Sequence, residues 1–503
     1  MSRSRDSEAG GLPVHRAPRR FLLSLWKPFW VHIDRCDASG VVGWVAPLKA
    51  LPADETLSVL DGWAAPVKAR LKPGGALRAA WQTRPLYRFH IPIPVAAAAQ
   101  GRPWRMSLGG QEQRVSMPGA PQDAPAPEAR FVRGGERPFA GKRVLVVLSS
   151  IDWNFRRQRQ QQLAQGLAPA YDHVLYLGPG SLDHAAGNPA ALFDVADGIA
   201  AVALPSASTA DMAVERVPAD DARQMAEQLN GLLDGAAQAD VLCMFPGWQP
   251  IVAALKPGRL VYDILDDHGS FDHIRQDILD EEQALIGQAD LVTSPHKGLL
   301  ERAGHAAAQA LVPNGFDPAA LSAADADHPR AARAVYLGAI ESWFDWPQVI
   351  KAAEALPAIA FEIMGRVDVS PPGPLPANVV LKGEVPHAMA MGHLCDASVA
   401  LIPFRVTPLT RMVDPVKLYE YMAAGLPVVA TPFLDASWGQ VEGVDIEGQS
   451  DRFAAAVKRL ADAADPALRK ALMHRAQTAS WAARAGALLD ALEGGAPAGQ
   501  SRG

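Results

Sequence analysis

The feature that most constrains the fold is a regular alternation of short apolar runs and amphipathic segments that begins at Lys142. Residues 143–148 (RVLVVL) form a continuous apolar run, which is typical of a strand that is covered on both faces of a parallel sheet. Residues 157–167 follow with the spacing of an amphipathic helix, and the next apolar run begins at residue 173. This repeated strand–helix order predicts an α/β fold with doubly wound parallel sheets.

The alternation occurs in two series, separated by the polar, turn-rich residues 313–333. The expected strands of the first series are residues 143–148, 173–177, 200–204, 241–245, 260–265 and 291–293. Those of the second series are residues 334–338, 361–365, 379–383, 399–404 and 428–431. We therefore predict two tandem Rossmann-like domains, residues 141–315 and 316–495, with a ligand cleft at the carboxyl ends of their strands.

The chain before this alternation has a different pattern. Residues 28–117 contain short β segments separated by turn signals, which predicts a small β-sandwich-like accessory domain. Residues 118–140 begin with PGAPQDAPAP and are interpreted as a Pro-rich linker. Residues 1–27 are interpreted as a basic tail.

Composition limits the partners and the location. Lys and Arg number 48 against 54 Asp and Glu, a formal net charge of −6, which argues against binding to nucleic acid through its phosphates. The three cysteines, Cys36, Cys243 and Cys395, lie far apart, which favours a reducing cytoplasm. No apolar run is long enough to span a membrane. Seven basic against three acidic residues in positions 1–35 leave two interpretations open, a peripheral contact with the inner face of the cell membrane or a solvated tail.

Several ligand classes are disfavoured by the residues directly after the first strand of each series. The segments SSIDW (residues 149–153) and GAIES (residues 338–342) lack the Gly-x-Gly-x-x-Gly turn that binds a dinucleotide. A P-loop is absent, and no His, Asp or Glu group has the spacing of metal ligands. We therefore expect neither a bound cofactor nor a metal.

Residues 399–431 (VALIPFRVTPLTRMVDPVKLYEYMAAGLPVVAT) contain the clearest candidate binding segment. An apolar strand leads into a polar loop that contains Thr410 and Asp414, and a helix is expected to begin near Pro415. Lys417 and Glu420 are three residues apart and therefore share one face of this helix. A carboxylate in this position can accept hydrogen bonds from a ribose diol, and an ammonium near the helix start can bind a phosphate.

Over residues 142–489 the chain resembles nucleotide-sugar glycosyltransferases of the GT-B fold, of the type that synthesises bacterial polysaccharides. The resemblance rests on the order and spacing of six segments, which are residues 152–164 (DWNFRRQRQQQLA), 262–271 (YDILDDHGSF), 290–295 (DLVTSP), 313–317 (PNGFD), 336–345 (YLGAIESWFD) and 414–429 (DPVKLYEYMAAGLPVV).

This resemblance implies roles for individual residues. Glu420 would hold the donor ribose, Lys417 and Arg366 would face the donor diphosphate, and Gly338 would open the loop around the phosphates. In many relatives another glutamate lies eight residues before the one that corresponds to Glu420. This chain has Met412 at that position, and Asp414 is the nearest carboxylate.

The acceptor base is expected in the first series. The apolar residues 260–265 are followed by Asp266 and Asp267, two adjacent carboxylates at the carboxyl end of an expected strand. A carboxylate that is crowded by a like charge can have a raised pKa and act as a general base. We assign this role to Asp267, with Asp266 as the alternative.

These interpretations predict a metal-independent glycosyltransferase that transfers a sugar from a nucleotide-diphosphate sugar to a glycan or lipid-linked acceptor in cell-surface polysaccharide synthesis. Two alternatives stay open. One is a sugar-nucleotide epimerase with a GT-B shape. The other is a non-catalytic glycan-binding protein on a degenerate scaffold, which is consistent with Met412 in place of the glutamate that the resemblance implies.

Overall fold

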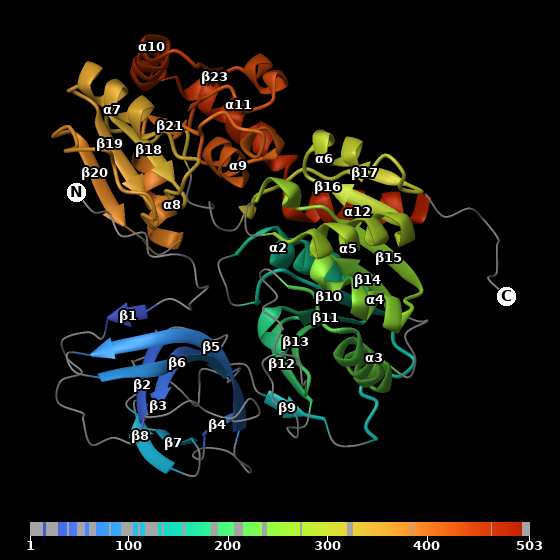
Figure 1. Ribbon diagram of the computed structural model, residues 1–503. Coiled ribbons are helices and arrows are strands. Elements are labelled where there is room, and N and C mark those ends of the chain that lie inside the picture. The colour runs from blue at the N-terminus through green and yellow to red at the C-terminus, as the bar shows by residue number, and fades with distance from the viewer. Residues whose placement is uncertain are drawn as a thin grey trace, which may run out of the picture. The chain divides into compact units, whose positions relative to one another are not determined.

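The computed structural model describes most of the α/β part of the chain and the strands of the N-terminal part (Figure 1). The described residues are 14–16, 29–37, 40–47, 56–59, 67–79, 82–91, 104–108, 111–115, 129–132, 135–153, 157–182, 190–205, 215–233, 239–271, 274–318, 325–383, 385, 387–463 and 465–494.

The N-terminal strands form an eight-stranded sheet of largely antiparallel pairs. Seven of its strands lie in the order β2-β3-β6-β5-β4-β7-β8, and β1 pairs with β5. Their bounds are β1 Val14–Arg16, β2 Phe29–Asp37, β3 Gly40–Pro47, β4 Thr56–Val59, β5 Val67–Ala79, β6 Gln82–Ile91, β7 Trp104–Leu108 and β8 Gln111–Val115. The β-sandwich arrangement of this region stays a prediction, and residues 1–13 and 17–28 of the expected tail lie outside the described residues.

The first α/β sheet has nine strands in the order β17-β16-β15-β14-β10-β11-β13-β12-β9. The strands are β9 Ala129–Phe131, β10 Val144–Leu148, β11 His173–Leu177, β12 Ala191–Ala196, β13 Ile199–Ala203, β14 Ala239–Cys243, β15 Arg259–Asp263, β16 Leu291–Ser294 and β17 Gln309–Leu311. Every residue of the central strand β10 is buried, as its apolar run predicts, and it pairs in parallel with β11 and β14. Strand β9 lies within the expected linker and pairs with β12, so the sheet begins before residue 141.

Five α-helices accompany this sheet in the described part of the chain. They are α2 Arg159–Leu167, α3 Ala219–Leu233, α4 Gln249–Leu255, α5 Gln276–Gln288 and α6 Lys297–Arg302. In α3 the apolar residues Met225, Leu229 and Leu232 recur at helical spacing and are buried, which explains how the helix packs.

The second α/β sheet has six parallel strands in the order β20-β19-β18-β21-β22-β23. They are β18 Arg333–Leu337, β19 Ala360–Met364, β20 Val379–Gly383, β21 Val399–Ile402, β22 Val428–Ala430 and β23 Val444–Ile446. The remaining helices are α7 Trp346–Ala355, α8 His387–Asp396, α9 Val416–Ala423, α10 Ser450–Asp462, α11 Pro466–Gln477 and α12 Trp481–Gly494. The last of these, α12, contacts β16 of the first sheet.

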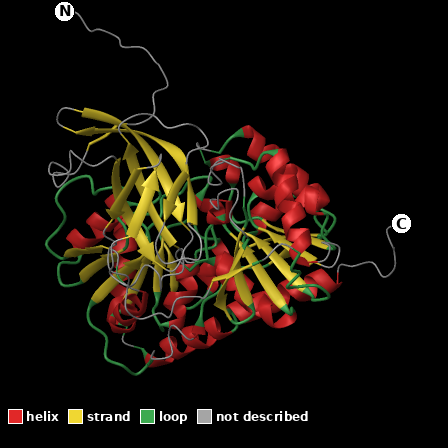
Figure 2. Ribbon diagram, turned by 90° about the horizontal axis from the view of Figure 1, so that it is seen from below, coloured by secondary structure: helices red, strands yellow, loops and turns green. Residues whose placement is uncertain are grey.

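The chain divides into two compact units, residues 1–260 with 275–285, and residues 261–274 with 286–503. Figure 2 shows the helices in red beside the strands of the α/β sheets in yellow. The described residues thus confirm the predicted Rossmann-like α/β fold, with parallel and mixed sheets and eleven α-helices. None of the described helices combines the length and the apolar character that crossing a membrane requires.

Candidate functional site

Two glycines bring the backbone together at the carboxyl edge of the second sheet. Gly338 follows β18 with φ 149°, and Gly365 follows β19 with φ 144°. A Cβ atom on Gly365 would lie 1.9 Å from the carbonyl oxygen of Gly338, so no other residue fits this crossing. The edge therefore presents bare backbone to a ligand.

The Lys417 side chain lies directly over this backbone. A Cβ atom on Gly338 would lie 3.1 Å from Cε and 3.3 Å from Nζ of Lys417. Its Nζ atom lies 4.6 Å from the ring centroid of Phe404 and 5.4 Å from that of Tyr336. Among the described residues, no oxygen accepts a hydrogen bond from this ammonium. Burial lowers the pKa of Lys417 to about 8, and only the charge of Glu420 opposes that shift.

Helix α9 holds Lys417 and Glu420 on one face, as the sequence predicts. The helix begins directly after Pro415, and proline suits this position because it has no N–H group that would be left unpaired. Tyr421 of the same helix is buried, and its hydroxyl oxygen accepts a 2.8 Å hydrogen bond from the Leu337 amide at the end of β18. This bond fixes the helix against the strand that leads to Gly338.

Arg366 lies at the same edge but is already paired. Its guanidinium donates to Asp368 over 2.6 Å and to Glu341 over 3.2 Å, and the side chain is half-exposed. A phosphate would have to compete with two carboxylates for this cation. Lys417 is therefore the stronger of the two predicted phosphate-binding cations.

Thr410 and Asp414 shape the loop that precedes α9. The Thr410 residue is 2% exposed, and its hydroxyl donates to the Arg405 carbonyl over 2.6 Å. The Asp414 carboxylate accepts from the backbone N–H of Asn314 over 2.6 Å and from the Tyr419 hydroxyl over 3.0 Å. In this structure both side chains make contacts within the protein, and their predicted role in substrate binding stays a prediction.

Met412 occupies the position at which many relatives carry their other glutamate. A Cβ atom on Gly298, in α6, would lie 2.6 Å from the Met412 sulfur. The methionine side chain therefore packs against the start of α6.

The two adjacent carboxylates after β15 have different surroundings. The Asp267 side chain is 3% exposed and accepts hydrogen bonds from Arg302 and Ser270. The Asp266 side chain is accessible to solvent at its surface, yet it is closely surrounded by protein. This desolvation raises the pKa of Asp266, His268 lowers it, and the charge of Asp267 raises it further. The geometry thus favours Asp266 over Asp267 as the carboxylate that is available for proton transfer.

The structure brings Gly338, Lys417 and Glu420 together at one sheet edge and places Asp266 and Asp267 at the end of β15. Sequence reasoning missed Gly365 and the aromatic rings beneath Lys417. The signal for Gly365 was a repeated pattern, since both glycines directly follow an apolar strand of the same series. Within the described residues, no group of three or more His, Cys, Asp or Glu side chains could hold a metal ion.

These features define an α/β protein in which a half-buried lysine lies over the glycine backbone of a sheet edge. Comparison with known proteins shows what the chain is similar to. Residues 339–463, which include Arg366, Lys417 and Glu420, match the family described as "Glycosyl transferases group 1". No curated protein sequence matches the chain significantly. The predicted resemblance to GT-B nucleotide-sugar glycosyltransferases is confirmed.

Two solved structures illustrate the shared fold. One is described as trehalose-6-phosphate from E. coli bound with UDP-2-fluoro glucose, with 14% identity, a TM-score of 0.50, and coverage of 70% of this chain and 99% of that chain. The other is an α,α-trehalose-phosphate synthase (UDP-forming) from Burkholderia xenovorans in complex with glucose-6-phosphate. It has 11% identity and a TM-score of 0.50, and the match covers 70% of this chain and 100% of that chain. At these identities the similarity establishes the fold alone.

Proposed function

We propose that this protein transfers a sugar from a nucleotide-diphosphate sugar to a glycan or lipid-linked acceptor in cell-surface polysaccharide synthesis. The observation that carries the proposal is the Lys417 ammonium, which lies over the bare backbone of Gly338 without an oxygen partner among the described residues. A partly buried cation without an acceptor is unfavourable unless a ligand supplies the oxygen. The family match at residues 339–463 supports the same reaction class.

The donor diphosphate would lie along the Gly338 and Gly365 backbone, where no side chain intervenes. Lys417 and the amides at the start of α9 would stabilise its charge. Glu420, one turn further along α9, would accept hydrogen bonds from the ribose diol. The E. coli relative is described as bound to UDP-2-fluoro glucose, which is a donor of this class.

The transfer itself needs a base for the acceptor hydroxyl. We assign this role to Asp266, because its raised pKa suits proton acceptance and its side chain is accessible. The acceptor oxygen forms a bond to the anomeric carbon, and the bond from that carbon to the diphosphate oxygen breaks. The hydroxyl proton passes to Asp266, and the electron pair leaves with the diphosphate beside Lys417. Asp267 would position this segment through Arg302 and Ser270.

We further propose that the reaction needs no metal ion, because Lys417 and the helix amides can balance the leaving-group charge. Chelation with EDTA should leave transfer unchanged. A loss of transfer that Mg²⁺ restores would contradict this part of the proposal.

The location at the inner face of the cell membrane is proposed from the basic residues of positions 1–35. The domain boundaries at residues 28–117, 118–140, 141–315 and 316–495 are proposed on the sequence pattern. Because β9 belongs to the first α/β sheet, a shortened chain should begin before Ala129.

The donor site is tested by measuring the affinity for a panel of nucleoside diphosphates by calorimetry. Glu420→Ala should weaken binding of the preferred diphosphate by about 2–3 kcal/mol, because hydrogen bonds to charged groups contribute more than those between neutral groups. Glu354→Ala, on the exposed face of α7, is the control and should bind as wild type. Equal affinities for all three proteins would remove Glu420 from the site.

The base is tested by Asp266→Asn and Asp267→Asn in parallel. Asp266→Asn should lower the transfer rate by roughly 10²–10⁴ with little change in donor affinity. Asp267→Asn should reduce the rate less and should lower stability, because it weakens the pairing of the buried Asp267 side chain with the exposed Arg302 guanidinium. A larger rate loss at Asp267 would return the base to that residue. Transfer to an acceptor, as opposed to release of an isomerised nucleotide sugar, distinguishes this function from the epimerase.

A further inference from the structure

A cavity borders the loop that precedes α9, because Arg411 of that loop lines it. It has a volume of about 880 Å³, which is in the range of small-molecule binding sites. Its walls come from the segment after β22, from β23 and the residue that follows it, from α10, from His296 and from Arg411 of the loop before α9. Lys417, Glu420 and Gly338 are not among its lining residues, so the cavity is distinct from the donor contacts.

The charges in the cavity are only partly balanced. Asp435 is paired with Lys297 over 2.8 Å, which lowers the pKa of that carboxyl, and Asp445 is paired with Arg459. Arg411 and Arg452 also line the cavity, and no carboxylate of the described residues pairs with either. They come from different elements, so the fold brings two available guanidinium groups to one space.

His296 adds a neutral hydrogen-bond donor. Its Nδ1 atom accepts a 3.1 Å hydrogen bond from the Gly298 amide at the start of α6. A ring nitrogen that accepts carries no proton, so the proton of the neutral ring is on Nε2. Burial lowers the pKa of His296 and keeps the ring neutral at physiological pH.

The rest of the lining suits a sugar. Glu447 lines the cavity and can accept hydrogen bonds from hydroxyl groups, and the neighbouring Phe433, Leu434 and Ile446 supply apolar surface. A ligand with several hydroxyls and one anionic group would satisfy both the carboxylate and the two guanidinium groups.

We propose that this cavity binds an acceptor sugar that carries one anionic group, a carboxylate or a phosphate, next to Arg411 and Arg452. The proposal rests on the proposed transferase function, since it places the acceptor beside the loop that leads to Lys417. It defines the acceptor as an acidic saccharide and the cavity as its specificity site.

The test measures binding of glucose, glucuronic acid and glucose 6-phosphate to the full-length protein by ligand-observed NMR titration. One of the two anionic sugars should bind about tenfold more tightly than glucose, and which one it is identifies the anionic group. Arg452→Gln should remove this preference. Lys458→Gln removes the same charge from α10 at an exposed position that does not line the cavity, and it should keep the preference.

Three results would overturn the proposal. They are equal binding of all three sugars, an unchanged preference in Arg452→Gln, or inorganic phosphate binding as tightly as glucose 6-phosphate. Nucleoside-diphosphate affinity, measured on the same samples, keeps the two proposals separate. Absent nucleoside-diphosphate binding with a preference that depends on Arg452 would contradict the transferase function and support the cavity as a site.

Discussion

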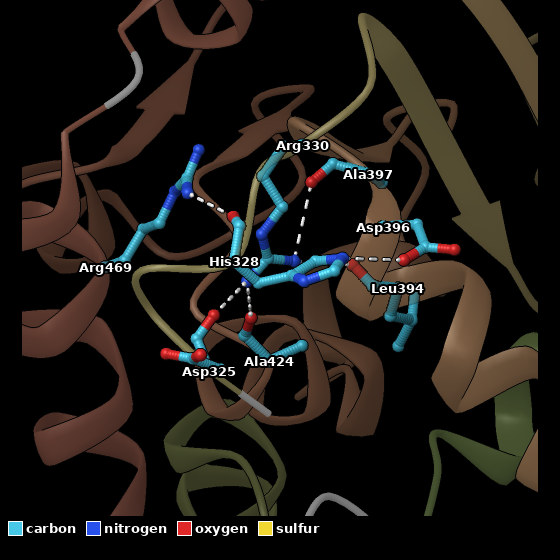
Figure 3. Close-up of polar contacts among 8 residues, drawn as sticks. All are labelled: Asp325, His328, Arg330, Leu394, Asp396, Ala397, Ala424 and Arg469. Atoms are coloured by element: carbon cyan, nitrogen blue, oxygen red, sulfur yellow. Dashed lines mark hydrogen bonds and ion pairs between the residues drawn. The ribbon is translucent and has the colours of Figure 1, made fainter. Parts of the chain in front are cut away.

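The two edges of the six-stranded sheet differ in whether a partly buried cation has oxygen acceptors within the protein. At the amino edge, before β18, the Arg330 guanidinium donates to the carbonyls of Leu394 over 3.0 Å and Ala424 over 2.9 Å (Figure 3). Arg469 donates to the carbonyls of Ala326 and His328, each over 3.2 Å. The Arg330 bonds join the connector before β18 to the ends of α8 and α9, and the Arg469 bonds join the same connector to α11.

At the carboxyl edge the arrangement is reversed. Lys417 lies between aromatic rings and a glycine backbone, and no described oxygen accepts from it. Desolvation lowers the pKa of both Arg330 and Lys417, but only Arg330 is compensated by several carbonyls. The difference indicates that the amino edge stabilises the fold, and it supports the proposal that the carboxyl edge binds an anionic ligand.

The largest effect is expected from breaking the amino edge. Arg330→Ala leaves carbonyls at the ends of α8 and α9 without their donors, which should lower the free energy of unfolding by about 2–4 kcal/mol. Urea denaturation measures this loss. Lys470→Ala removes an exposed ion pair with Asp327 and should cost less than about 1 kcal/mol. If the folded Arg330→Ala protein loses nucleoside-diphosphate affinity, the two edges are not functionally separate.

At the carboxyl edge we expect a smaller change, in ligand affinity and not in stability. Lys417→Met should weaken diphosphate binding by about 2 kcal/mol, roughly thirtyfold, while the affinity for the free nucleoside changes little. Stability should stay equal or rise slightly, because an uncompensated partly buried charge is removed. Calorimetry with both ligands and urea denaturation measure these quantities, with Lys351→Met at an exposed position of α7 as the control. Equal losses for diphosphate and nucleoside would refute a phosphate contact.

The smallest expected effect is a pH dependence of diphosphate binding that comes from Lys417. The pKa of Lys417 is lowered to about 8, so the ammonium is charged below that pH and neutral above it. Diphosphate binding needs the charged form, so the dissociation constant should rise as pH increases past 8, approaching about tenfold per pH unit. Lys417→Met should show a flat profile over the same range. A rise that persists in Lys417→Met would assign the titration to another group.

The sequence alone was sufficient for features that depend on local periodicity. Unbroken apolar runs such as residues 143–148 predicted buried parallel strands, because a strand covered on both faces has no solvent side to alternate with. The three-residue spacing of Lys417 and Glu420 predicted their shared helix face for an equally local reason. The resemblance to GT-B glycosyltransferases also followed from the order of short segments along the chain.

Only the tertiary structure decided how residues distant in sequence share space. The contact of Gly365 with Gly338 depends on the pairing of two strands, and that of Met412 with Gly298 on the packing of a loop against α6. The adjacent Asp266 and Asp267 look equivalent in sequence, yet Arg302, 35 residues further along, engages Asp267 and leaves Asp266 accessible. Desolvation and pairing depend on which atoms surround a group, and those atoms come from segments that local spacing does not relate.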